Sequence, residues 1–188
     1  TRSNDGRADP FGGFWIGTMG VAAEPQAGSI YRLFEGKIVK LFPNLTISNS
    51  ICFSPDRKFG YFCDTPERQI MRVTLDQSGW PSSDPEVFID LREANLNPDG
   101  AIIDRSGNLW SAQWGASRVA QYDRNGRFVS ELKFDAKQIS CPAIGGENMS
   151  TLFATSASVD LDNACPNDGK TFLIEVDCGG QEEHQVML

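Results

Sequence analysis

The sequence predicts an all-β protein with the architecture of a β-propeller, and three observations carry this prediction. Hairpin-like motifs recur along the chain at intervals of roughly 40 to 50 residues, a spacing typical of propeller blades. Short apolar runs alternate with turn residues, and the 188 residues include 18 glycines and 10 prolines, which favours short strands over long helices. No stretch shows the sustained periodicity of a long amphipathic helix.

Each repeat is marked by an aromatic residue in the second strand of a predicted hairpin. These residues are Trp15, Phe62, Trp110 and Phe153, spaced 43 to 48 residues apart. A turn containing Gly, Asp or Asn precedes each aromatic, as expected for a tight connection between antiparallel strands. The turns lie at residues 9–13, 55–60, 104–108 and 147–151, the last being a looser copy. Four hairpins therefore predict the inner halves of four blades.

Further strands are predicted to complete the blades. Third strands are expected at residues 29–33, 69–75, 118–122 and 170–176. Outer strands are expected at residues 37–42, 85–91 and 128–134, and the fourth repeat has no obvious counterpart. Many of these runs alternate polar and apolar residues, as half-exposed strands do. We expect about four four-stranded blades, with a turn of helix near residues 93–97.

The repeats divide the chain into a partial propeller at residues 1–178 and a polar tail at residues 179–188. An open arc of four blades would leave two sheet faces uncovered. We therefore expect a companion N-terminal segment of about two blades that completes a larger, closed propeller. A closed four-bladed propeller is the alternative.

Composition narrows the functional classes. The net charge is −8, with 40% hydrophobic and 22% charged residues, which fits a globular protein and argues against nucleic acid or an anionic membrane as partner. The five cysteines include no C-x-x-C pair, so neither a zinc cluster nor a disulfide framework is expected. Cys52 and Cys63 lie in apolar runs and are expected to be buried thiols. A cytoplasmic location is the default expectation.

Three polar residues lie at the same phase of the repeat: Asn4, Asn49 and Asp99. Asn4 and Asp99 each precede their aromatic by eleven residues, and Asn49 precedes Phe62 by thirteen, across a longer hairpin. In the fourth repeat the matching position falls near Cys141. Equivalent positions in a circular array converge on one axis, so we expect the three side chains around one mouth of the channel. The alternative is that they are ordinary turn residues before a strand.

Convergent oxygen atoms suit a hard divalent cation, with Asp99 supplying charge and Asn49 a neutral oxygen. Two ligands are too few, and no Glu of the chain is clearly placed to add a third. The only histidine, His184, lies in the polar tail and is expected in solvent, which argues against a His-based triad or a His-rich zinc site. Hydrolysis would then need a carboxylate base and a metal, which suits an activated ester such as a lactone.

Arg2, two residues before Asn4, is a candidate for binding a hydroxyl or carboxylate of the substrate. The alternative is a solvated charge near the end of the chain.

Several segments resemble the senescence marker protein / gluconolactonase / regucalcin family. They are RSNDGRADP at residues 2–10, ISNSICFSPD at residues 47–56 and PDGAIID at residues 98–104, followed by GNLWSA at residues 107–112. These match the family patterns R-x-N-D-G-[KR]-x-D-P, I-S-N-G-[LI]-x-[FW]-S and P-D-G-x-x-[IV]-D with G-x-L-W-V-A. The resemblance runs from residue 1 to about residue 178, and its motifs are specific in combination.

The resemblance implies a six-bladed propeller with one divalent cation in its channel, held by Asn49 and Asp99. Calcium is expected first, with zinc, magnesium and manganese as alternatives. The family assigns the Asp the role of general base in hydrolysis of a sugar lactone, and the equivalents of Arg2 and Asn4 contact that substrate. The family's remaining ligand is a Glu in its first blade, a segment this chain does not contain. Ser50 departs from the family pattern, where Gly usually follows the Asn.

Three functions therefore compete. The leading expectation is a metal-dependent sugar-lactone hydrolase, of which this chain is a C-terminal portion. A calcium-binding regulatory propeller without significant turnover is the second, and a plain propeller interaction module is the third.

Overall fold

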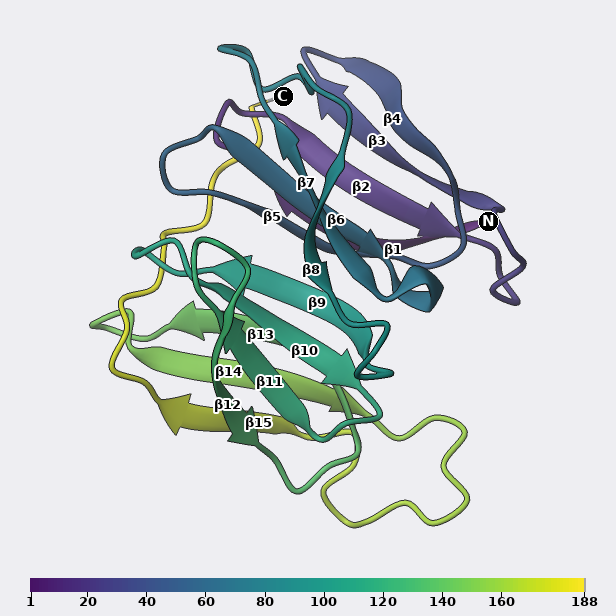
Figure 1. The fold of residues 1–188 in the computed structure, drawn as a ribbon, viewed down its shortest axis with the longest axis vertical. Coiled ribbons are helices and arrows are strands. Elements are labelled where there is room, and N and C mark those ends of the chain that lie inside the picture. Colours follow the sequence, from purple (N-terminus) through teal and green to yellow (C-terminus); the bar gives the residue numbers. More distant parts are fainter. Residues whose placement is uncertain (188) are drawn as a thin grey trace.

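The computed structural model describes residues 1–187, which form four antiparallel sheets arranged as the blades of a β-propeller (Figure 1). The last residue of the predicted polar tail, Leu188, lies outside the described residues. Strands follow one another in each sheet in the order of the chain, so each blade is a simple meander. The described residues contain no helix with the length and apolarity needed to cross a membrane.

The first two blades each have four strands. Blade 1 comprises β1 (Arg2–Ala8), β2 (Phe14–Met19), β3 (Gly28–Phe34) and β4 (Lys37–Leu45). Blade 2 comprises β5 (Ser48–Phe53), β6 (Phe59–Asp64), β7 (Gln69–Thr74) and β8 (Glu86–Asp90), with a short 3₁₀ helix, η1 (Thr65–Glu67), between β6 and β7.

Blade 3 also has four strands, whereas blade 4 has three. Blade 3 comprises β9 (Asn97–Ile103), β10 (Leu109–Trp114), β11 (Arg118–Tyr122) and β12 (Phe128–Lys133). Blade 4 comprises β13 (Gln138–Gly145), β14 (Thr151–Ala157) and β15 (Thr171–Glu175). The four blades confirm the predicted fold class, and the three strands of blade 4 agree with the lack of an outer apolar run in the fourth repeat. The chain after β15 is polar and pairs instead with loops of blades 4, 3 and 1.

The first strands of the blades lie beside one another, β1 next to β5, β5 next to β9 and β9 next to β13. These strands therefore line the axis of the array, as the repeat predicted. They all run in the same direction, so their first residues gather at one end, here called the upper mouth. The hairpins that follow them gather at the opposite, lower end.

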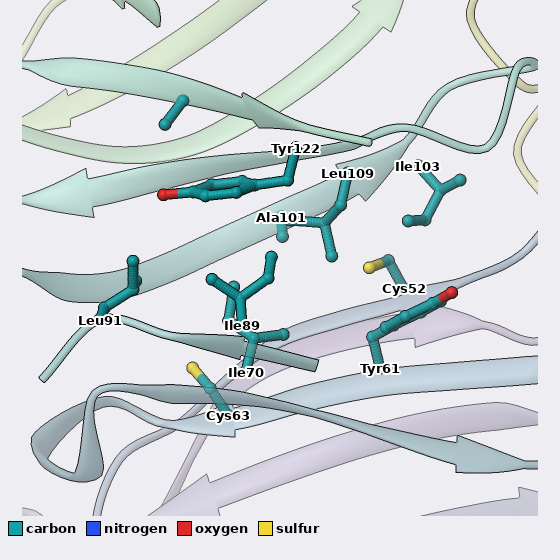
Figure 2. Packing of buried hydrophobic residues seen from close by; sticks show 11 residues of the cluster. Cys52, Tyr61, Cys63, Ile70, Ile89, Leu91, Ala101, Ile103, Leu109 and Tyr122 are labelled. Carbon is teal, nitrogen blue, oxygen red and sulfur yellow. The ribbon is translucent and has the colours of Figure 1, made fainter. Parts of the chain in front are cut away.

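The cores lie between successive blades. Blades 1 and 2 enclose Trp15, Ile30, Ile51 and Phe53. Blades 2 and 3 enclose a second cluster that includes Cys52, Tyr61, Cys63 and Leu109 (Figure 2). Blades 3 and 4 enclose a third, around Trp110, Ile139 and Leu152. Burying one large apolar side chain contributes roughly 1.5–3 kcal/mol, so each blade depends on its neighbours for stability.

The aromatic marker of the second repeat is Tyr61 rather than Phe62. Trp15 and Trp110 both pack toward the following blade. In blade 2 Tyr61 packs toward blade 3, whereas Phe62 packs back against blade 1. The prediction of Phe62 assumed a hairpin between β5 and β6 that is one residue longer than the hairpin in the structure. Because successive side chains of a strand point to opposite faces of the sheet, this one-residue error selected the residue on the wrong face.

The predicted turn of helix at residues 93–97 is not helical. The segment is a hydrogen-bonded turn in which the amide of Asn95 donates to the carbonyl of Arg92 at 3.1 Å, and Asn97 already begins β9.

The C-terminal tail is held along the lower end of the blades and runs back to blade 1 (Figure 1). The amide of Gly180 donates to the carbonyl of Met149 at 2.7 Å, and the amide of Met187 donates to the carbonyl of Gly12 at 2.8 Å. His184 is half-buried rather than fully solvated, and burial lowers its pKa.

Candidate functional site

The inner strands are irregular close to the upper mouth. The pairing of β1 with β2 shifts register between Ser3 and Gly6, and the pairing of β5 with β6 shifts between Asn49 and Cys52. The same irregularity occurs in β9, between Pro98 and Ala101. A β-bulge re-aims the side chains around it, so each blade presents polar groups where a regular strand would continue its ladder.

A continuous hydrogen-bonded chain joins the upper mouths of blades 1, 2 and 3. The Nδ2 of Asn4 donates to the carbonyl of Ser48 at 3.0 Å and to Oδ1 of Asn49 at 2.9 Å. The Nδ2 of Asn49 donates to Oγ1 of Thr65 at 2.9 Å, and that hydroxyl donates to the carbonyl of Pro98 at 2.7 Å. The structure thus brings Asn4 and Asn49 into direct contact and places Asp99 one residue beyond the end of the chain of hydrogen bonds.

Arg2 lies at the exposed rim of this chain of hydrogen bonds. Its Nη1 donates to Oδ1 of Asn4 at 3.1 Å and to the carbonyl of Ser3 at 2.9 Å. The guanidinium is therefore next to Asn4, and its remaining donors are open to a ligand in the mouth.

The carboxyl of Asp99 has a pKa close to physiological pH. Burial raises its pKa to about 7, and the nearby charge of Asp5 adds to the effect, while a hydrogen bond from the amide of Gly100 works against it. A carboxylate with a pKa near neutrality is suited to exchange protons with water at physiological pH.

Asp5 is a second carboxylate at the upper mouth, and the sequence motifs alone did not identify it. One of its oxygens accepts the amide of Ile51 and the other accepts the amide of Gly6, both at 2.8 Å. Burial raises the pKa of Asp5 as well. The signal was present in the N-D-G motif, but simple strand alternation would direct Asp5 away from Asn4. The bulge in β1 instead lets both side chains reach β5.

The lower side of the site is closed by Arg7 and the tail. The Nε of Arg7 donates to the carbonyl of Ile51 at 3.0 Å, and its Nη2 donates to the carbonyl of Ala101 at 3.3 Å. Its Nη1 forms an ion pair with Glu183 of the tail. A cavity of about 20 Å³ remains here, lined in part by Arg7, Cys52 and Glu183.

The donor chemistry of the upper mouth suits a hard cation. Oδ1 of Asn49 accepts one hydrogen bond, from Asn4, which leaves a lone pair for a cation. The charge of Asp5 makes ionisation of Asp99 more costly, and a bound cation would relieve that repulsion. The described residues contain no group of three or more His, Cys, Asp or Glu side chains arranged around a metal position. The residues present therefore fit part of an oxygen ligand set.

Ser50 tightens the contact between blades 2 and 3. Its φ of 58° lies in the left-handed region, where Gly is favoured. Its hydroxyl donates to the backbone carbonyl of Asp99 at 2.5 Å and accepts a contact from Sγ of Cys63 at 3.3 Å. The serine that replaces the usual Gly thus hydrogen-bonds the site instead of crowding it.

Comparisons with known proteins agree with this architecture. The "SMP-30/Gluconolactonase/LRE-like region" family model matches residues 1–158. A "Putative sugar lactone lactonase" from Rhizobium meliloti is 43% identical over 187 residues, covering 97% of this chain and 64% of the relative. An "L-arabinolactonase" from Azospirillum brasilense is 39% identical over 173 residues, covering 89% of this chain and 57% of the relative.

Solved structures match equally well. A calcium-binding protein, regucalcin, from Agrobacterium tumefaciens superposes with a TM-score of 0.96 at 44% identity, covering 99% of this chain and 65% of that one. A luciferin-regenerating enzyme matches with a TM-score of 0.91 at 29% identity, covering all of this chain and 66% of that one. The chain spans between half and two thirds of the length of these relatives. With this fold, these motifs and a family match over most of its length, the chain belongs to the SMP-30/gluconolactonase/LRE-like family.

Proposed function

We propose that this chain carries most of the active site of a divalent-cation-dependent hydrolase that opens sugar lactones. The observation that carries the proposal is the convergence of Asn4, Asn49 and Asp99 from three blades at one mouth, with the pKa of Asp99 raised to about 7. Relatives such as the "L-arabinolactonase" and the "Putative sugar lactone lactonase" support the same chemistry.

Asp99 acts as the general base in this proposal. Its carboxylate takes a proton from a water molecule as the water oxygen attacks the carbonyl carbon of the lactone. The ester bond to the ring oxygen then breaks, and the proton passes to that oxygen. The product is an open-chain hydroxy acid, and Asp99 returns to its starting state. A carboxylate is a weak base, which suits a strained ester better than an amide.

Asn49 Oδ1 and the Asp99 carboxylate would hold the cation, with calcium proposed first and zinc, magnesium or manganese as alternatives. A bound divalent cation supplies polarisation of the lactone carbonyl. Asp5 lies next to this pair and holds the amide of Ile51, so it keeps β1 and β5 in place around the ligands. The remaining oxygen ligands would come from water, the substrate or a companion segment.

Arg2 and Asn4 bind the sugar part of the substrate in this proposal. The Oδ1 of Asn4 and the free guanidinium donors of Arg2 lie side by side at the rim. Together they offer an acceptor and several donors, which match the hydroxyl groups of a sugar lactone. The partner is thus a small neutral molecule, with a cytoplasmic location proposed for its hydrolysis.

A companion segment N-terminal to residues 1–178 is proposed to complete the ring, two blades in a six-bladed propeller. The outer strands of the end blades expose apolar side chains, Ile38 at 71% and Leu173 at 62%. The length of the relatives beyond the matched region supports such a segment. The tail from residue 179 is proposed to form a separate strap across the lower end.

Calcium binding without turnover is the second candidate, favoured by the similarity to the Agrobacterium regucalcin, which is a calcium-binding protein. One experiment separates the two functions. Acid release from a panel of aldono-lactones is followed in a pH-stat with the metal-free protein and after addition of calcium, zinc, magnesium or manganese. We expect cation-dependent turnover of at least one lactone. Tight calcium binding with no turnover on any lactone would instead support the regulatory function.

A further inference from the structure

A second cleft lies between the lower ends of blades 2 and 3, away from the proposed active site. We call it the arginine cleft. It has a volume of about 150 Å³, and its lining includes Asp56, Phe59, Tyr61, Arg72, Arg105 and Arg124. Asn49 is near the start of β5, whereas the cleft begins after its end. At about 3.3 Å per residue, the two sites are separated by roughly 16 Å along the strand.

Each guanidinium of the cleft is held by contacts that leave donors free. The guanidinium of Arg72 lies over the ring of Phe59 at 4.7 Å and pairs with Glu86. The Nε of Arg124 donates to the carbonyl of Ser106. The guanidinium of Arg105 lies against Gly179, so close that a Cβ added to this glycine would come within 3.3 Å of it.

Two of the three guanidinium groups, those of Arg105 and Arg124, form no ion pair with any carboxylate of residues 1–187. Asp56 is the acidic residue of the lining, and its carboxylate already accepts the hydroxyl of Ser54 at 2.7 Å and the amide of Lys58 at 3.2 Å. The lining therefore holds three arginines and one acidic residue, on a chain of net charge −8.

The floor of the cleft is aromatic. Tyr61 is 5% exposed and belongs to the core between blades 2 and 3. Figure 2 shows its hydroxyl at the edge of that cluster, directed away from Cys63 and Ile70. Phe59 packs beside it and supports Arg72. The cleft thus combines an apolar floor with a phenol and guanidinium donors at its rim.

We propose that the arginine cleft binds a small molecule through an oxyanion group, either a carboxylate or a phosphate. Guanidinium forks recognise both groups by paired, charge-assisted hydrogen bonds. A volume of this size accommodates a molecule of about one six-membered ring. The ligand is an anion, so it differs from the neutral lactone proposed for the upper mouth. The two sources of such a group are free phosphate and a sugar acid of the kind that lactone opening releases.

The test uses isothermal titration of the intact chain with inorganic phosphate and, separately, with gluconate, at low ionic strength. The test variant is R105Q/R124Q, whose two exposed side chains make no core contact. The control is R127Q, an exposed arginine that lies in the same turn as Arg124 but outside the cleft. We expect saturable binding of at least one anion, weakened at least tenfold in the double variant and unchanged in R127Q.

Each outcome decides the question. Binding of phosphate alone identifies a phosphate ligand, and binding of gluconate alone identifies a sugar acid; both support the proposal when the double variant loses it. Absence of saturable binding up to about 10 mM anion, tenfold above a millimolar Kd, would overturn it, as would equal loss in R127Q. Circular dichroism of both variants checks that the fold is retained. The result is independent of lactone turnover, since Asp99 and Asn49 are unchanged.

Discussion

Asp99 and Asp5 show how the charge state of single residues follows from their placement. Both are acidic groups held at the upper mouth, where burial favours the protonated form. The repeat pattern singled out Asp99 because it shares the phase of Asn4 and Asn49. It did not single out Asp5, because only the bulge in β1 brings that side chain to β5.

The raised pKa of Asp99 predicts a pH dependence of stability in the metal-free chain. Its carboxyl has a pKa of about 7 in the fold against an ordinary value of 3.8. Between these values the folded chain binds more protons than the unfolded chain, so stability decreases as pH rises through about 7. We expect metal-free wild type to gain stability relative to D99N when the pH is lowered from 8 to 6.

Urea denaturation of both proteins in the presence of a chelator measures this difference. The lowered pKa of His184 acts in the opposite sense below its usual value of 6.5, but it acts equally in both proteins and cancels. Parallel pH profiles for wild type and D99N would contradict the raised pKa of Asp99.

At the scale of elements, the hairpins could be predicted from the sequence and the bulges could not. Turn residues and apolar alternation are local signals, so the inner, second and third strands were confirmed. A bulge depends on the pairing of two strands and leaves no local signature. The same limit explains the choice of Phe62 over Tyr61, because the length of the hairpin sets which residue faces the next blade.

The bulge of β5 predicts a specific order of stability for substitutions at Ser50. S50A keeps the strained left-handed φ and loses the hydroxyl that donates to Asp99. S50G loses the same hydrogen bond, but glycine adopts the left-handed φ without backbone strain. Relief of that strain offsets roughly 1 kcal/mol of the loss. We therefore expect S50A to be destabilised by about 1–2 kcal/mol and S50G to lie within about 1 kcal/mol of wild type. Chemical denaturation of the three proteins tests the order, and S50A matching S50G would contradict it.

At the scale of the whole molecule, the tail was the least predictable part. Its polar composition indicated a solvated segment, yet it contacts blades 4, 3 and 1 through backbone hydrogen bonds and the pair between Glu183 and Arg7. The residues in contact are far apart in the sequence and follow no repeat, so no local sequence pattern predicts these contacts. The three-stranded form of blade 4, by contrast, was already visible in the sequence, which has no outer apolar run in the fourth repeat.

The ion pair between Arg7 and Glu183 of the tail is expected to stabilise the fold, and a matched pair of variants can measure its contribution. Arg7 is 16% exposed at its side chain, so removing its partner leaves a mostly buried charge unpaired. We expect E183Q to reduce the free energy of unfolding by roughly 1–2 kcal/mol, after discounting for the exposed position of Glu183. E182Q, which changes an exposed neighbour, should have little effect. Equal values for the two variants would show that the ion pair is not stabilising.

The central claim, that Asp99 serves as base in cation-dependent opening of a sugar lactone, is tested most directly by kcat/KM of wild type and D99N. Both are measured on the best lactone substrate at saturating cation, with cation binding verified for each by titration. We predict that D99N loses at least about 100-fold in kcat/KM. Retention of the wild-type rate by a cation-loaded D99N protein would contradict the account.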